Sequence, residues 1–330
     1  MIKYGFNFLW MFIFSESGPE QVNEKELDFL AETGFNFVRI PTDYRFWTKD
    51  FDYFHPDEDV FLSIDTYLKA CTDRGLHMCL NLHRAPGYCI NNNELERDNL
   101  WTDKIAQDAF IFIWELFAKR YKGIPSTLLS FDLVNEPANI EEYGLTRDNH
   151  EDLVRRTTDA IWAIDPDREV VIDGLGGGNI AMPELADLDV VHSGRGYQPM
   201  PLTHYKAGWW DNGGYDALPA YPGMNWDGIV WDKAAIREYY KPWRQVQELG
   251  AKVHIGEFGC YDKTPNDVAL KWFEDILSLY KEFEWGYSLW NFKGSFGIVE
   301  HGRPGTQYED YKGLKVDRRL VELLLENRVK

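Results

Sequence analysis

The segment 128–137 reads LLSFDLVNEP. Its first residues are mostly apolar, as in a strand buried on both faces of a sheet, and it closes on an amide, a carboxylate and a proline. Apolar, β-branched or aromatic runs of strand length recur along the whole chain. They lie at 4–8, 36–40, 76–82, 128–134, 169–173, 188–193, 252–256 and 285–290. The pattern therefore predicts eight strands spread evenly from one end to the other.

Helical patterns fill the gaps between these strands. The clearest ones cover 21–33, 102–120, 264–283 and 316–328. Thr264 and Pro265 predict an N-cap and a first helical residue for the third of these, and Pro183 shortens the fifth helix, near 179–187. Strands that alternate with helices and have no linker between them predict an α/β protein, a single-domain (β/α)8 TIM barrel over residues 1–330. A long aromatic-rich loop at about 194–231 follows the sixth strand and would overhang the active face.

Charge and hydropathy exclude several classes of function. The chain has 330 residues, and 35 Lys and Arg against 54 Asp and Glu give a net charge of −19. Such an acidic chain is not expected to bind nucleic acid or an anionic membrane, because both require basic residues. No apolar run approaches the roughly 20 residues that span a bilayer. Neither a nucleic acid nor a membrane is therefore an expected partner.

Cysteine and glycine patterns give no sign of a metal or cofactor. The four cysteines, Cys71, Cys79, Cys89 and Cys260, form no CxxC pair, and the histidines lack HExxH spacing. Glycines at 174–178 follow the fifth strand and indicate a tight turn, because they lack the spacing of a phosphate-binding loop. Reduced thiols and the strand pattern at 4–8 favour a cytoplasmic enzyme. The alternatives are that residues 4–14 belong to a signal peptide, or that the protein is secreted and its native leader is missing.

Polar residues cluster where the predicted strands end, which is where TIM barrels build their active sites. The ends of the second, third, fourth, sixth, seventh and eighth strands supply Arg39, His83, Asn135 with Glu136, Arg195 with Tyr197, Glu257, and Trp290. Glu136 and Glu257 close strands four and seven, which face each other across a barrel. A carboxylate pair that converges on one bond is the equipment of glycoside hydrolysis. Taken singly, each of these residues could instead be an ion-pair partner or a core residue.

This set of strand ends resembles glycoside hydrolase family 5, the retaining cellulases and mannanases of the clan A barrels. The resemblance extends from Gly5-Phe6-Asn7 to Gly313-Leu314-Lys315-Val316-Asp317. It implies that Glu136 is the acid/base and Glu257 the nucleophile. It further implies that Asn135 bonds the sugar 2-hydroxyl, that Arg39 and His83 orient the site, and that Trp290 floors the subsite of the cleaved sugar. A monomer is the expected state.

The sixth strand departs from the family pattern. The family carries His-x-Tyr there, whereas this chain reads Arg195-Gly196-Tyr197. Arg195 would add a permanent positive charge that could hold Tyr197, Glu257 or a substrate hydroxyl. His192 and His204 are the other candidates for the missing histidine's role. In the following loop, Trp209 and Trp210 are adjacent, and at least one of them is expected to line the cleft.

We therefore expect a retaining hydrolase that cleaves β-1,4-linked glucan through two carboxylates, without a metal or cofactor. An endo-β-mannanase, or an exo-acting β-glucosidase or β-mannosidase on oligosaccharides, remains an alternative. A carbohydrate-binding barrel without catalysis would have lost one of the two glutamates, and both are present. A nicotinamide-dependent oxidoreductase would need a phosphate site after strands seven and eight. The glycines that follow these strands give only weak support for such a site, so this class is not favoured.

Overall fold

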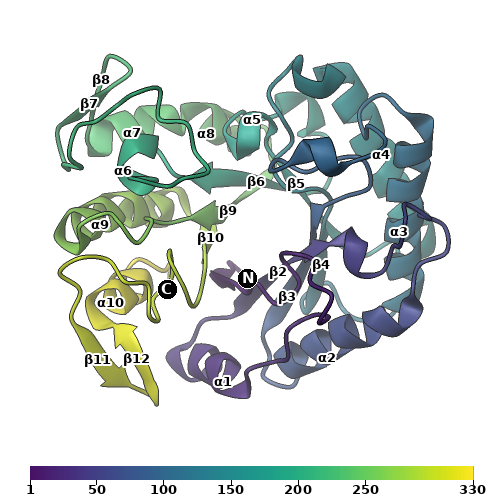
Figure 1. The fold of residues 1–330 in the computed structure, drawn as a ribbon, viewed down its shortest axis with the longest axis horizontal. Coiled ribbons are helices and arrows are strands. Elements are labelled where there is room, and N and C mark those ends of the chain that lie inside the picture. The colour runs from purple at the N-terminus through teal and green to yellow at the C-terminus, as the bar shows by residue number, and fades with distance from the viewer. Residues whose placement is uncertain (330) are drawn as a thin grey trace.

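The computed structural model describes residues 1–329 and forms a closed barrel of parallel strands (Figure 1). Around the barrel the strands run β1-β10-β9-β6-β5-β4-β3-β2, and β1 pairs with both β2 and β10. Their bounds are β1 (Tyr4–Asn7), β2 (Phe37–Asp43), β3 (His77–Arg84), β4 (Leu129–Asp132), β5 (Glu169–Asp173), β6 (Val191–Gly196), β9 (Lys252–Phe258) and β10 (Gly286–Leu289). The predicted α/β barrel is confirmed, and each predicted strand overlaps an observed one.

Helices surround the barrel, as Figure 1 shows. The helices are α1 (Glu24–Thr33), α2 (Phe61–Thr72), α3 (Lys104–Arg120), α4 (Arg147–Ile164), α5 (Leu175–Gly178), α6 (Met200–Thr203), α7 (Lys233–Tyr239), α8 (Lys241–Glu248), α9 (Asn266–Phe283) and α10 (Arg318–Glu326). Their apolar faces and the outward faces of the strands make one continuous core. Among the described residues, no helix is long and apolar enough to cross a membrane.

Two local expectations turn out differently. The prediction that Thr264 caps a helix and Pro265 begins it is wrong by one residue. Pro265 is the N-cap, and the Thr264 hydroxyl donates a 2.6 Å hydrogen bond to the Leu202 carbonyl oxygen. The weak fifth helix is reduced to a single 3-10 turn, Pro183–Leu185. A longer helix does not form here because proline has no backbone N–H to donate and the segment between β5 and β6 is short.

The segment between β6 and α7 is not wholly irregular. It contains α6 and a small hairpin of β7 (Met224–Trp226) and β8 (Ile229–Trp231). A second hairpin, β11 (Tyr308–Tyr311) with β12 (Leu314–Asp317), precedes α10. In Figure 1 the two hairpins lie outside the ring of barrel strands.

Candidate active site

Glu136 lies four residues beyond the last residue of β4, on a backbone turn that is fixed from both sides. Its φ is +46°, in the left-handed region that residues other than glycine seldom adopt. The backbone N–H donates a 3.0 Å hydrogen bond to Asp173 Oδ2, and the carbonyl oxygen accepts a 2.7 Å bond from the Tyr88 hydroxyl. These two bonds compensate for the unusual backbone conformation and aim the side chain.

Glu257 lies within β9, and three side chains bind its carboxylate. Arg39 Nη1 donates to Oε1 at 2.6 Å, and Arg195 Nη2 approaches the same oxygen at 3.3 Å. The Tyr197 hydroxyl donates to Oε2 at 3.1 Å. Charge-assisted bonds of this kind are short and directional, so they fix the orientation of the carboxylate.

Arg195 is completely buried and contacts both glutamates. In the sheet it is the register partner of Glu257. Its Nε donates to Glu136 Oε1 at 2.8 Å, while its two terminal nitrogens bind the carboxylate of Asp173 at the end of β5. One guanidinium therefore connects Glu136, Glu257 and Asp173. Of the uses expected for Arg195, contact with Glu257 is the one that the structure contains.

Arg39 makes a similar set of contacts and shares two acceptor oxygens, Glu257 Oε1 and Asn135 Oδ1, with Arg195. Its Nε donates to Asp132 Oδ2 at 2.7 Å, and its Nη2 donates to Asn135 Oδ1 at 3.0 Å. Asn135 Oδ1 also accepts from Arg195 at 2.9 Å, so both arginines orient this amide. The Asn135 Nδ2 group is buried and has no hydrogen-bond partner among residues 1–329. It is thus a donor available to a ligand, because buried donors normally have a partner.

Burial and neighbouring charges separate the pKa values of these carboxyls. Burial, followed by the negative charge of Glu257, raises the pKa of Glu136 to about 7 against the opposing charge of Arg195. Burial, together with Asp173, raises the pKa of Asp132 to about 7 as well. Burial also acts to raise the pKa of Asp173, but Arg195 and Arg39 outweigh it and hold that pKa below its ordinary value. Near neutral pH, Glu136 can therefore carry a proton.

His83 and Trp290 form an aromatic pair beside the carboxylates. Their rings stack with centroids 5.6 Å apart, and Phe12 meets Trp290 edge-on at 5.1 Å. Burial, and then Arg39 and Arg195, hold the pKa of His83 well below its usual value, so its ring is neutral. Both ring nitrogens lack a hydrogen-bond partner in the described chain. Like the Asn135 amide, this ring has hydrogen-bonding capacity left over.

The other predicted residues lie around Tyr197. His204 packs against the Tyr197 ring at 5.0 Å and against Phe296 at 5.5 Å, and its Nδ1 is 3.0 Å from the neighbouring threonine hydroxyl. Trp209 is 57% exposed and lies 6.3 Å from the His204 ring, whereas Trp210 is half-buried. One of the two adjacent tryptophans thus presents an open face close to this cluster.

His192 does not reach the carboxylates. Side chains alternate between the two faces of a strand, so Arg195 and Ser193 point into the barrel while His192 points outward. The Ser193 hydroxyl accepts a 3.1 Å hydrogen bond from Arg195 Nη1, which confirms the inward set. Of the two histidines considered for the role of the missing strand-six histidine, only His204 is near the site.

Sequence reasoning missed Asp132 and Asp173. Both carboxylates are 1% exposed and pair with the two buried arginines. The available signal was a charged residue within or at the end of an apolar strand, since buried charges are almost always paired. Asp132 interrupts such a run, and Asp173 closes one.

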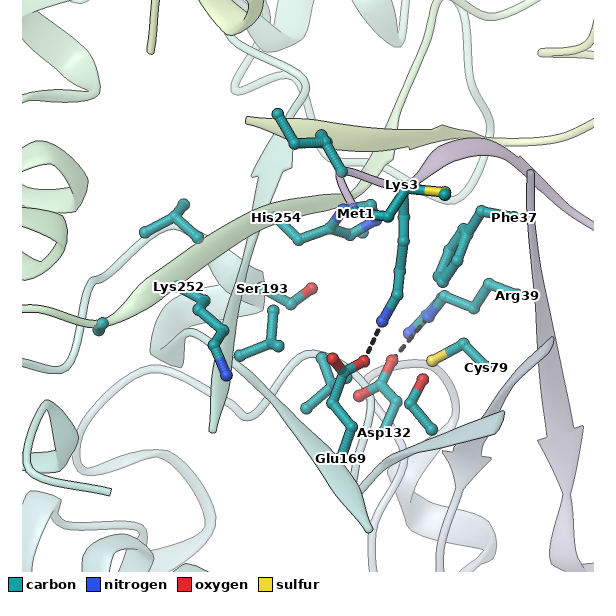
Figure 2. Close-up of a pocket in the computed structure, with 18 of the residues that line it drawn as sticks. Met1, Lys3, Phe37, Arg39, Cys79, Asp132, Glu169, Ser193, Lys252 and His254 are labelled. Carbon is teal, nitrogen blue, oxygen red and sulfur yellow. Dashed lines mark hydrogen bonds and ion pairs between the residues drawn. The ribbon is translucent and has the colours of Figure 1, made fainter. Parts of the chain in front are cut away.

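A cavity of about 480 Å³ occupies the opposite, N-terminal end of the barrel (Figure 2). Lys3, Glu169, Lys252 and His254 line its outer part, and Arg39 and Asp132 form its inner end. It therefore reaches the underside of the charged cluster, but its mouth lies away from Glu136 and Glu257. The acidic pair faces the other end of the barrel, where the strands finish.

The family model of "Cellulase (glycosyl hydrolase family 5)" matches residues 2–295. The chain belongs to glycosyl hydrolase family 5. It is therefore a glycoside hydrolase, which agrees with the resemblance inferred from the strand ends. The two glutamates that suggested the family lie at the carboxyl ends of β4 and β9, which β5 and β6 separate in the barrel.

Three proteins are similar to this chain over most of their length. Endoglucanase C of Acetivibrio thermocellus is 31% identical over 316 residues, which cover 87% of this chain and 89% of that protein. Cellodextrinase A of Ruminococcus flavefaciens is 26% identical, with 79% and 75% covered. A crystal structure described as a glycoside hydrolase is 70% identical, covers 100% of both chains and superposes with a TM-score of 0.98.

Proposed function

We propose that this family 5 enzyme hydrolyses β-1,4-linked glucan at internal bonds, with Glu136 as general acid/base and Glu257 as nucleophile. The observation that carries the proposal is that Glu136 and Glu257 contact the same guanidinium, that of Arg195, but differ in their other hydrogen-bond partners. Glu257 accepts bonds from two arginines and a tyrosine, whereas Glu136 accepts one from Arg195 and has a pKa raised to about 7. Such a division of environment is what separates a nucleophile from an acid.

The first step transfers the sugar to the enzyme. Glu257 attacks the anomeric carbon while Glu136 gives its proton to the departing glycosidic oxygen, so that one C–O bond forms as another breaks. In the second step the ionised Glu136 removes a proton from water, and that water displaces Glu257. The two inversions leave the product with the configuration of the substrate.

Unpartnered donors around the pair suit a sugar ring. The Asn135 Nδ2 group and the nitrogens of His83 are positioned beside the carboxylates with hydrogen-bonding capacity unused. Trp290 offers an aromatic face, and aromatic faces pack against the apolar C–H faces of pyranoses. The name of the endoglucanase relative supports glucan as the polymer, and that of the cellodextrinase relative supports short oligosaccharides as a second candidate substrate.

Product analysis tests the substrate and the mode of action. The enzyme is incubated with cellohexaose and with mannohexaose, and the products are separated over time. Internal cleavage of glucan releases mixed cello-oligosaccharides at once, whereas exo action releases one sugar or disaccharide unit throughout. If mannohexaose were cleaved faster than cellohexaose, the proposed substrate would be mannan instead of glucan. If neither oligosaccharide gave a product, the proposal would be refuted.

Azide rescue tests the assignment of the two glutamates. In Glu257→Ala the small anion occupies the vacated side of the ring and attacks there, so an α-configured glycosyl azide is expected. In Glu136→Ala the intact nucleophile first inverts the centre, and azide then gives a β-configured product. The opposite pairing of variant and product would exchange the two roles.

A further inference from the structure

Asp173 is a fully buried carboxylate that the mechanism above does not use. It closes β5 and accepts hydrogen bonds from both terminal nitrogens of Arg195. Its Oδ2 also accepts the backbone N–H of Glu136 at 3.0 Å and lies 3.6 Å from Arg39 Nη2. None of these contacts reaches the place of a substrate, so any role of Asp173 must act through its neighbours.

The first neighbour is the backbone of Glu136. This residue holds a left-handed conformation with φ of +46°, which costs energy unless other contacts fix it. Asp173 binds its N–H and Tyr88 its carbonyl oxygen. The glycine turn after β5 adds support, because Gly176 and Gly177 N–H groups donate to the carbonyls of Ala138 and Pro137, at 2.9 Å each.

The second neighbour is the charge of Arg195. Its Nε lies 2.8 Å from Glu136 Oε1 and, taken alone, would favour the ionised form of that carboxyl. An acid that must donate a proton cannot tolerate an uncompensated cation at this distance. Asp173 lies on the same guanidinium and contributes the opposite charge, within an interior that screens poorly.

We infer that Asp173 is a positioning residue that keeps Glu136 protonated for catalysis, by fixing its backbone and by offsetting the charge of Arg195. The inference rests on the proposed function, in which Glu136 is the acid. The titratable and charged groups around Glu136 come from every neighbouring element. Tyr88 (after β3), Asp173 (β5), Arg195 (β6), Tyr197 (after β6) and Glu257 (β9) act on Glu136 directly. Arg39 (β2) adjoins this set through Glu257, and Asp132 (β4) adjoins it through Arg39.

The test is the pH profile of Asp173→Asn. Asparagine keeps the shape and an acceptor oxygen but removes the charge. The alkaline limb of kcat/KM reports the loss of the acid's proton, and we expect it to move down by about one pH unit. At a pH above the alkaline limbs of both enzymes, kcat/KM of Asp173→Asn on cellopentaose should be about tenfold below that of the parent. On an aryl cellobioside, whose leaving group needs little protonation, the loss should be smaller.

A second pair of variants keeps the test decisive if the single variant does not fold. Arg195→Met should move the alkaline limb to higher pH, because the cation that favours ionised Glu136 is gone. Adding Asp173→Asn should bring the limb back toward the parent value, because the double variant has lost one charge of each sign. In the Arg195→Met background no buried cation is left unpaired, so adding Asp173→Asn is structurally mild. An alkaline limb that Asp173→Asn leaves unmoved in both backgrounds would overturn the inference.

Asp165→Asn is the matched control. Asp165 is also buried and pairs with an arginine, Arg168 at 2.8 Å, but it lies outside the cluster. Its variant should lose thermal stability while keeping the parent pH profile. If the parent enzyme cleaved neither substrate, the proposed function would fail. A second outcome would refute only the role of Asp173. In it, the parent cleaves cellopentaose and the aryl cellobioside, and Asp173→Asn loses kcat/KM equally on both substrates without a shift of either pH limb.

Discussion

Replacing Glu257 by glutamine should lower the pKa of Glu136. The negative charge of Glu257 is, after burial, the largest influence that holds the pKa of Glu136 at about 7. Glutamine is nearly the same shape, so the hydrogen bonds from Arg39 and Tyr197 can persist while the charge disappears. The ionised form of Glu136 then loses a repulsive neighbour.

The structure sets the size of the effect. Glu136 and Glu257 accept hydrogen bonds of 2.8 and 3.3 Å from the same guanidinium. Their oxygens therefore lie at most about 8 Å apart across the planar fork, and a retaining pair requires about 5.5 Å. At these separations and an effective dielectric constant of about 20, two unit charges repel by about 2–3 kcal/mol, equivalent to about 1.5–2 pKa units. The pKa of Glu136 should therefore fall from about 7 to about 5–5.5.

The titration can be read directly by NMR of enzyme labelled with 13C at the glutamate carboxyl carbons. The Glu136 signal is assigned in each background by its absence from the Glu136→Gln variant. Glu257→Gln should shift its midpoint down, whereas Asp165→Asn should leave it in place. A midpoint that stays near 7 or rises in Glu257→Gln would show that the charge of Glu257 does not raise the pKa of Glu136, and the reasoning above would be wrong.

Three further outcomes are expected. Glu136→Gln should cost about 10²–10⁴ in kcat/KM on cello-oligosaccharides and much less on a nitrophenyl cellobioside, whose leaving group needs no acid; equal losses would give this residue another role. Tyr197→Phe removes the 3.1 Å bond to the nucleophile's Oε2, a bond to a charged acceptor worth about 1.5–3 kcal/mol, so steady-state kcat/KM should fall at least about tenfold, and an unchanged value would contradict this. Gly178→Ala places a Cβ 2.4 Å from Arg195 Cγ, whereas at Gly177, also at positive φ, the nearest atom is 3.6 Å away. Denaturant unfolding should show Gly178→Ala less stable than Gly177→Ala by about 1–3 kcal/mol, and similar stabilities would argue against the clash.

Strand positions could be predicted because they depend on local pattern. The apolar run at 252–256 is a strand whether or not its partners are known, and the same holds for 36–40. Once the barrel is inferred, the rule that sites lie at strand ends places Arg39, Asn135 and Glu257 close together. Arg195 could also be singled out from the sequence, because it occupies the histidine position of the His-x-Tyr pattern.

Hydrogen-bond partners could not be predicted in the same way. Alternation along a strand indicates which face a side chain occupies, but not which neighbour its polar atoms will meet across the barrel. Asp173 looks like an ordinary strand end until β6 brings Arg195 beside it. The cap at Thr264 failed for a related reason, since a tertiary contact with Leu202 competed with the local one.

Closure of the barrel has a consequence for how the chain folds during synthesis. β1 is made first and pairs with β10, which begins 282 residues later. At about 5–20 residues per second, β1 waits roughly 15 to 55 seconds on the ribosome for its second neighbour. Throughout that interval the growing sheet has two unpaired edges, which invite pairing with other nascent chains. Arg39 can pair with Asp132, 93 positions downstream, while the sheet is still open, but its contact with Glu257 forms only when the barrel is nearly complete, 218 positions downstream.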